Sequence, residues 1–269
     1  MLRLSMNELT TFRWSFEEDV HNYAAADINA IGVWRQKLSD YGEEKGIELL
    51  SEYGMQVSNL LWAGGFTGSE GSSFEEGIDD AAAAIQLAGE LNAAALIVCS
   101  GGRGGHIWNH ARRLLVTALR ELAPLAEQEN VALAVQPMHP NCAADCSVLT
   151  SLRETLELIE EIDSEAVKLA FDTYHLCQFD ESLSEIEDVA ARIAVVHVAD
   201  CRELPGREQN RCLLGEGKIP LREIMIRLLS AGYDGFFDVE LFGEDVETCD
   251  YQQLLRQSKT FCQELLAAV

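Results

Sequence analysis

Basic residues are scarce in this sequence. Its 269 residues include 20 lysines and arginines against 45 aspartates and glutamates, which gives a formal net charge of −25. Such a surface repels polyanions, so nucleic acid is not an expected partner. The apolar stretches are short or interrupted by charged residues, so no membrane contact through a spanning helix is expected. The N-terminal stretch lacks the apolar block of a secretory signal, and we expect a cytoplasmic protein.

Cysteine pairs of the kind that bind structural zinc are also missing. None of the eight cysteines belongs to a Cys-x-x-Cys pair, and the nearest two, Cys142 and Cys146, have no second cluster to complete a site. We therefore expect reduced thiols, several of them core residues, which agrees with a cytoplasmic location.

What the chain does have is a repeated alternation of strand-like and helix-like segments. Strands are expected at residues 2–6, 30–34, 55–62, 94–99, 131–136, 167–172, 193–197 and 236–240, and helices at 40–53, 74–91, 109–130, 150–162, 182–191, 220–231 and 250–267. Continuous apolar strands indicate a parallel sheet covered on both faces. The length suits a barrel of this kind, which needs about 250 residues. We predict an α/β fold, a single (β/α)8 TIM barrel forming one domain over residues 1–269, with a doubly wound sheet as the structural rival.

The last four expected strands each end in a residue that can bind a metal. These residues are Gln136, Asp172, His197 and Glu240. In a barrel of parallel strands the carboxyl ends meet at one face, where active sites lie, so this pattern favours the closed barrel over the open sheet. Two carboxylates, one imidazole and one amide oxygen suit a single divalent ion, Mn²⁺, Co²⁺, Mg²⁺ or Zn²⁺, and not a thiolate-bound structural zinc.

Several local sequences resemble a known family. The segments are 171–175 (FDTYH), 196–200 (VHVAD), 215–217 (GEG) and 232–240 (GYDGFFDVE). They are similar to the xylose isomerase-like TIM-barrel superfamily, and within it to the sugar phosphate isomerase/epimerase group. The superfamily also contains the apurinic-site endonucleases of family 2 type. Those enzymes use extra histidines at the ends of strands three and four, where this chain has Trp62 and Ser100, so DNA repair is not expected.

The resemblance implies roles for individual residues. Gln136, Asp172, His197 and Glu240 map to the metal ligands, and His175 maps to a substrate contact. Glu240 and His175 are also the candidate catalytic residues, with Glu240 as the base. Arg202 lies near the place of a substrate-binding arginine. The implied substrate is a small polyhydroxy carbonyl compound such as a keto-sugar or inosose, deprotonated beside a metal-bound carbonyl.

Three further residues are candidates for substrate contacts from their own positions. Trp34 and Trp62 stand at strand ends, where aromatic faces suit the C–H surfaces of a sugar, although both also suit a core position. His139 follows Gln136 closely and is expected at the rim of the site.

Gln136 departs from the family pattern, which has a carboxylate at this place. An amide cannot accept or donate a catalytic proton at neutral pH, so two-base epimerisation is in doubt. One-base chemistry remains: aldose-ketose isomerisation, or dehydration of an inosose-like or keto-sugar substrate with His175 or His139 as proton donor. A catalytically degenerate barrel that only binds a sugar is the third alternative, and homo-oligomerisation is left open.

Overall fold

Eight parallel strands close into a barrel, in the spatial order β1-β2-β3-β4-β5-β6-β7-β8. The computed structural model describes residues 2–69, 71–177 and 186–266. The strands are β1 (Arg3–Asn7), β2 (Ala30–Trp34), β3 (Gln56–Gly64), β4 (Ala95–Cys99), β5 (Ala132–Val135), β6 (Val167–Asp172), β7 (Ile193–Val198) and β8 (Phe236–Val239). Strand β8 pairs in parallel with β1 and completes the ring. The predicted (β/α)8 TIM barrel is confirmed.

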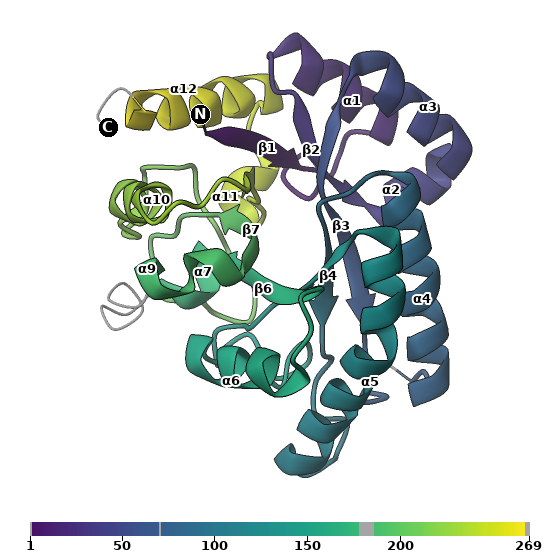
Figure 1. Cartoon of the computed structure of the whole chain (residues 1–269). Helices are drawn as coiled ribbons and strands as arrows, with labels where there is room; N and C mark the ends of the chain where they lie inside the picture. The colour runs from purple at the N-terminus through teal and green to yellow at the C-terminus, as the bar shows by residue number, and fades with distance from the viewer. Residues whose placement is uncertain (1, 70, 178–185, 267–269) are drawn as a thin grey trace.

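Helices surround the strands, as Figure 1 shows. They are α1 (Phe16–Ala25), α2 (Arg35–Tyr41), α3 (Glu43–Tyr53), α4 (Phe74–Glu90), α5 (Trp108–Glu129), α6 (Leu152–Ile162), α7 (Thr173–Leu176), α9 (Ile186–Val189), the 3-10 turn η1 (Ala190–Arg192), α10 (Leu221–Ser230), α11 (Glu244–Glu247) and α12 (Tyr251–Leu266). Within the described ranges, no helix is both long enough and apolar enough to cross a membrane.

The starts and ends of the helices follow from single residues. Ser15 and Ser73 each accept a hydrogen bond from the backbone three residues on and complete a capping box at the start of α1 and α4. The helix expected over 40–53 is instead two helices, because Gly42, at φ 104°, separates α2 from α3. Of the helix expected over 182–191, residues 182–185 lie outside the described part of the chain, and α9 and η1 follow them.

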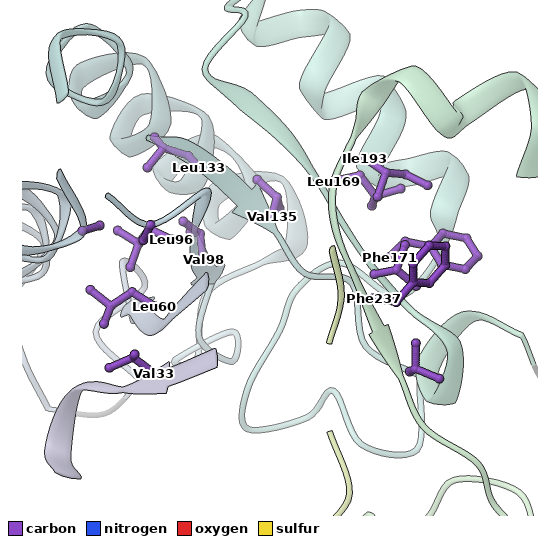
Figure 2. Packing of buried hydrophobic residues seen from close by; sticks show 14 of the residues in the cluster. Val33, Leu60, Leu96, Val98, Leu133, Val135, Leu169, Phe171, Ile193 and Phe237 are labelled. Atoms are coloured by element: carbon purple, nitrogen blue, oxygen red, sulfur yellow. The ribbon is translucent and has the colours of Figure 1, made fainter. Parts of the chain in front are cut away.

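The larger part of the core lies between the strands and the helices. Figure 2 shows side chains of this layer, among them Val33 from β2, Leu96 from β4 and Phe237 from β8. All three are buried, as are Ala81, Ala84 and Ala88 of α4, whose small side chains let this helix lie close to the sheet. Burial of this apolar surface is the main force that stabilises the barrel.

The barrel interior is filled by a second, smaller cluster. It contains Ala134 on β5, Ala170 on β6, Val195 on β7 and Phe236 on β8. Side chains two residues apart on a strand point to the same face. The next inward positions on these strands are therefore residues 136, 172, 197 and 238, which are all polar, so the apolar interior supports a polar layer near the carboxyl ends of the strands.

Candidate active site

Strand register brings the polar residues of this layer together. Asp172 pairs with His197 between β6 and β7, and His197 pairs with Asp238 between β7 and β8. Glu240 follows β8 directly and continues the ladder, because its backbone N–H donates to Val198 O at 3.1 Å. Three neighbouring strands thus direct three carboxylates and an imidazole to one side of the barrel mouth.

Asp172, His197 and Glu240 form a compact buried cluster. One candidate ligand atom from each residue lies within 4.8 Å of the other two. Neither ring nitrogen of His197 has a hydrogen-bond partner among the described residues, although the side chain is fully buried. An imidazole left unpartnered between two carboxylates is the donor set expected for a divalent ion. The residues therefore fit the predicted metal.

Asp172 also organises the chain that follows it. Its Oδ1 accepts hydrogen bonds from the backbone N–H of Tyr174 at 2.7 Å and of His175 at 3.3 Å, and so caps the short helix α7. This cap explains the local sequence, since the turn that begins at Asp172 brings His175 back over the cluster. The Nε2 atom of His175 lies 3.8 Å from Asp172 Oδ2.

His139 contacts His175 at the edge of the cluster. The backbone N–H of His139 donates to His175 Nδ1 at 3.3 Å, which leaves Nε2 as the proton-bearing nitrogen of a neutral His175 ring. Burial lowers the pKa of His175 to about 4, so the ring is neutral at physiological pH. Burial also lowers the pKa of His139. The two histidines predicted to contact substrate, His139 and His175, therefore lie side by side, and His175 lies next to Asp172.

Gln136 follows β5 and reaches the cluster through Asp172. Its Nε2 donates to Asp172 Oδ2 at 3.1 Å, and its backbone N–H continues the strand ladder to Val98 O at 3.0 Å. The side chain is 6% exposed. The amide thus neighbours the predicted metal site, and its role as a ligand stays a prediction.

Arg211 is the residue that the sequence reasoning missed. Its Nη2 lies 3.3 Å from Glu240 Oε2 and 3.6 Å from Asp172 Oδ2. The guanidinium is held between two rings, 4.3 Å from the centroid of Tyr174 and 3.7 Å from that of Phe242. In the sequence it stands just before the 215–217 motif, in a segment with no expected strand or helix, so no signal there singled it out.

The two carboxyls of the cluster differ in their electrostatics. Burial alone would raise the pKa of Asp172, but the neighbouring His175 and Arg211 outweigh it and lower the pKa. Burial raises the pKa of Glu240, although His197 and Arg211 oppose the shift. The environment therefore favours a proton on Glu240 over one on Asp172.

Arg202 lies away from these residues. Its side chain is about half exposed and forms ion pairs with Glu216, at 2.6 Å, and with Asp245. These pairs join the loop after β7 to the 215–217 loop and to α11. The structure thus brings Arg211, and not Arg202, to the Asp172 cluster, and substrate binding by Arg202 stays a prediction.

The two predicted tryptophans line a separate cavity of about 440 Å³ at the ends of β2 and β3. Trp62 is 45% exposed and Trp34 is half-buried. Arg35 and Asp80 form a two-bond ion pair in the wall of this cavity, at 2.8 and 2.9 Å. The structure brings the tryptophans together, and their contact with substrate stays a prediction.

The motif at 215–217 has a structural explanation. Asp200 is buried, and its carboxylate accepts hydrogen bonds from the backbone N–H of Gly215 and Gly217 at 3.0 Å and of Ile219 at 3.2 Å. A Cβ on Gly217 would lie 2.0 Å from Asp200 Oδ1, so only glycine permits this approach. Asp200 therefore holds the loop that follows Arg211.

The family profile for xylose isomerase-like TIM barrels matches residues 20–265. The chain therefore belongs to this family, as its sequence motifs predict. Among solved structures, the protein SMc04130 from Sinorhizobium meliloti 1021 is similar over 98% of both chains, with a TM-score of 0.90 and 26% identity. A zinc-bound IolI protein is similar over 99% of both chains, with a TM-score of 0.85, but at 17% identity this shows the fold alone.

Proteins of similar sequence include an isomerase, an epimerase and a dehydratase. An inosose isomerase from Halalkalibacterium halodurans is 23% identical over 58% of this chain and 55% of the relative. A fructoselysine 3-epimerase from Shigella flexneri is 26% identical over 62% of this chain and 59% of the relative. A 3-dehydroshikimate dehydratase from Pseudomonas putida is 20% identical over 88% of this chain and 37% of the relative. The chain spans a little over half the length of the first two relatives.

Proposed function

We propose that this protein is a divalent-metal-dependent enzyme of the isomerase/epimerase type, acting on a small sugar, keto-sugar or inosose. The observation that carries the proposal is the buried convergence of Asp172, His197 and Glu240 within 4.8 Å. The isomerase and epimerases among the relatives support the reaction class. When bound, the ion would polarise a substrate carbonyl and stabilise the charge that develops after deprotonation.

Glu240 is the base in this proposal. It follows β8 at the mouth of the barrel and is 4% exposed, so substrate proton and carboxylate would meet out of bulk water. Its raised pKa suits a group that must both take up and return a proton. Gln136, on the other side of Asp172, can orient a substrate hydroxyl but cannot exchange a proton. One-base isomerisation is therefore favoured over two-base epimerisation.

Arg211 and His175 complete the proposed site. The Arg211 guanidinium offers donors beside Glu240 that can hold a substrate oxygen with negative charge. His175 is neutral, with its proton on the nitrogen that faces Asp172. In this state it can donate a hydrogen bond to a substrate hydroxyl and does not compete as a base.

Dehydration is the second candidate function. Glu240 removes the proton next to the carbonyl and can return that same proton to the leaving hydroxyl, so that water is released and the carboxylate is regenerated. A neutral His175 next to the cluster can hold the leaving hydroxyl by a hydrogen bond. The similarity to a 3-dehydroshikimate dehydratase over 88% of the chain supports this alternative. The third alternative is a catalytically degenerate barrel that binds a sugar without converting it.

Deuterium exchange tests these alternatives. Purified protein with Mn²⁺ would be incubated in deuterated water with a panel of keto-sugars and inososes, and carbon-bound deuterium and loss of water would be followed by NMR. We expect exchange with at least one substrate, abolished in Glu240→Gln and retained in Glu244→Gln, a matched change at an exposed glutamate. Isomerised product favours the first function and loss of water the second. No exchange with any substrate, in protein shown to hold the ion, would overturn both.

A further inference from the structure

Strand β8 directs a second carboxylate into the barrel that the proposed reaction does not use. Asp238 lies two residues before Glu240 and so points to the same side. The His197 ring lies between these two carboxylates. Its Nδ1 is 3.7 Å from Glu240 Oε2, and its Nε2 is 3.8 Å from Asp238 Oδ2. Each nitrogen of the imidazole therefore faces one carboxylate of the same strand.

Hydrogen bonds from neighbouring strands fix the position of the Asp238 carboxylate. Its Oδ2 accepts hydrogen bonds from Asn7 Nδ2 at 2.7 Å and from Asn59 Nδ2 at 2.9 Å. Its Oδ1 accepts one from Ser58 Oγ at 3.2 Å. A Cβ on Gly32 of β2 would lie 2.6 Å from Asp238 Oδ2, so a glycine is required where the carboxylate approaches the backbone. Three strands besides β8 thus contribute to its place.

The donors that hold Asp238 are all neutral. A fully buried carboxylate is costly unless charged or strongly polar groups compensate it. Within the described part of the chain, the basic side-chain nitrogen found within 4.0 Å of Asp238 is His197 Nε2, at a distance of 3.8 Å that is longer than a hydrogen bond. The partner of one imidazole nitrogen decides which nitrogen carries the proton and which keeps its lone pair.

We propose that Asp238 is a positioning residue for the metal site, which keeps the His197 proton on Nε2 and leaves the Nδ1 lone pair facing Glu240. A carboxylate behind a metal-bound histidine fixes the ring orientation and makes the ligand more basic. Asp238 also adds a negative charge to those of Asp172 and Glu240. It therefore compensates for the carboxylate that Gln136 replaces, although it lies on the far side of the His197 ring from Glu240. The inference rests on the metal site proposed above.

Two measurements test this role. The first is calorimetric titration of metal-free protein with Zn²⁺, comparing the parent with Asp238→Asn and with Asp234→Asn, the same change at an exposed position just before β8. We expect a roughly 10–100-fold loss of affinity in Asp238→Asn and no change in Asp234→Asn. Circular dichroism would show whether each variant is folded.

The second measurement uses the unaltered sequence. In protein with ¹⁵N-labelled histidine and bound Zn²⁺, the His197 signal, assigned by its loss in His197→Gln, should show a slowly exchanging proton on Nε2 and zinc on Nδ1. A proton on Nδ1 would overturn the inference, as would equal zinc affinity of Asp238→Asn and the parent. If Asp238→Asn does not fold, the ¹⁵N spectrum decides. Failure of the parent to bind zinc would overturn the proposed metal site, and this inference with it.

Discussion

The Gln136 amide donates to Asp172 Oδ2 at 3.1 Å, where a strand-five carboxylate would instead repel Asp172. An amide at this position therefore changes both the charge near the proposed metal and the number of groups that can carry a proton. In the proposed reaction Glu240 is the base, because its pKa is raised whereas that of Asp172 is lowered.

Restoring a carboxylate at this position should strengthen metal binding. We expect Gln136→Glu to bind Mn²⁺ about tenfold more tightly or better, because a carboxylate ligand adds a unit negative charge next to the ion. Calorimetric titration of metal-free protein measures the change. Gln128→Glu, the same substitution on the exposed side of α5, is the control and should bind like the parent. Equal affinity of Gln136→Glu and the parent would show that residue 136 lies outside the metal's reach.

Arg211 should matter most when no metal is bound. Its guanidinium is the cation between Asp172 and Glu240, and removing one partner of a buried charge cluster costs about 3–5 kcal/mol. We expect Arg211→Met to lower the free energy of unfolding by this amount without metal and by clearly less with saturating Mn²⁺, since the ion also neutralises the carboxylates.

Urea denaturation with and without Mn²⁺ measures this difference. Arg153→Met, at a side chain that is 85% exposed, is the control and should change stability little in either condition. A loss in Arg211→Met that is the same with and without the ion would contradict the account.

Single residues also show where prediction from sequence ends. Asp172, His197 and Glu240 were predictable, because strand ends in a barrel face one point and the motifs around them are specific. Arg211 was not, because it lies in the irregular segment between β7 and α10 and reaches the cluster by stacking on Tyr174 and Phe242. Arg202 is nearer to His197 in sequence, but its ion pairs hold it at the surface.

At the scale of elements, a buried charge cluster joins β1 to its first two helices. Glu8 follows β1, Asp19 belongs to α1 and Lys37 to α2. Lys37 Nζ donates to Asp19 Oδ2 at 2.6 Å and to the backbone oxygens of Glu8 and Thr11. Burial raises the pKa of Asp19 to about 6 and that of Glu8 well above its ordinary range. The sequence did not predict this cluster, because the three residues are far apart in the chain and belong to no recognisable motif.

Removing the lysine should destabilise the fold in a pH-dependent way. The raised folded-state pKa of Asp19 means that its neutral form is favoured in the fold, a contribution present below about pH 4 and lost as the pH rises through about 6. Lys37 compensates the charge that then forms. We expect Lys37→Met to cost about 3–5 kcal/mol at pH 8 and clearly less at pH 5.

Urea midpoints at pH 5 and pH 8 check this prediction. Lys45→Met, at an exposed position of α3, should leave both midpoints within experimental error of the parent. A Lys37→Met variant destabilised equally at both pH values would show that the lysine acts through packing alone.

At the scale of the whole molecule, the barrel was predictable because the alternation of apolar strands and amphipathic helices runs along the chain. The strand positions agree to within one or two residues at most ends. The helix at 40–53 was wrong in its extent, since the start of α2 has neither a side-chain cap nor an acidic first turn to mark it. Such boundaries depend on tertiary packing more than on local sequence.

Metal binding should stabilise the whole fold. The proposed ligands come from β6, β7 and the end of β8, and they are assembled only in the folded chain. At a free metal concentration about 100 times the dissociation constant, binding adds about 2.7 kcal/mol to the free energy of unfolding. We expect a chelator to lower the Tm by several degrees in the parent and to leave the Tm of His197→Ala unchanged. Equal chelator shifts in the two proteins would place the metal elsewhere.

The proposed function requires one ion at the cluster of Asp172, His197 and Glu240. The most direct test is a crystal structure of the protein with Mn²⁺, with the ion located by its anomalous scattering. We predict one strong peak within coordination distance of all three side chains. A peak that avoids these residues, or none there at saturating Mn²⁺, would contradict the proposed function.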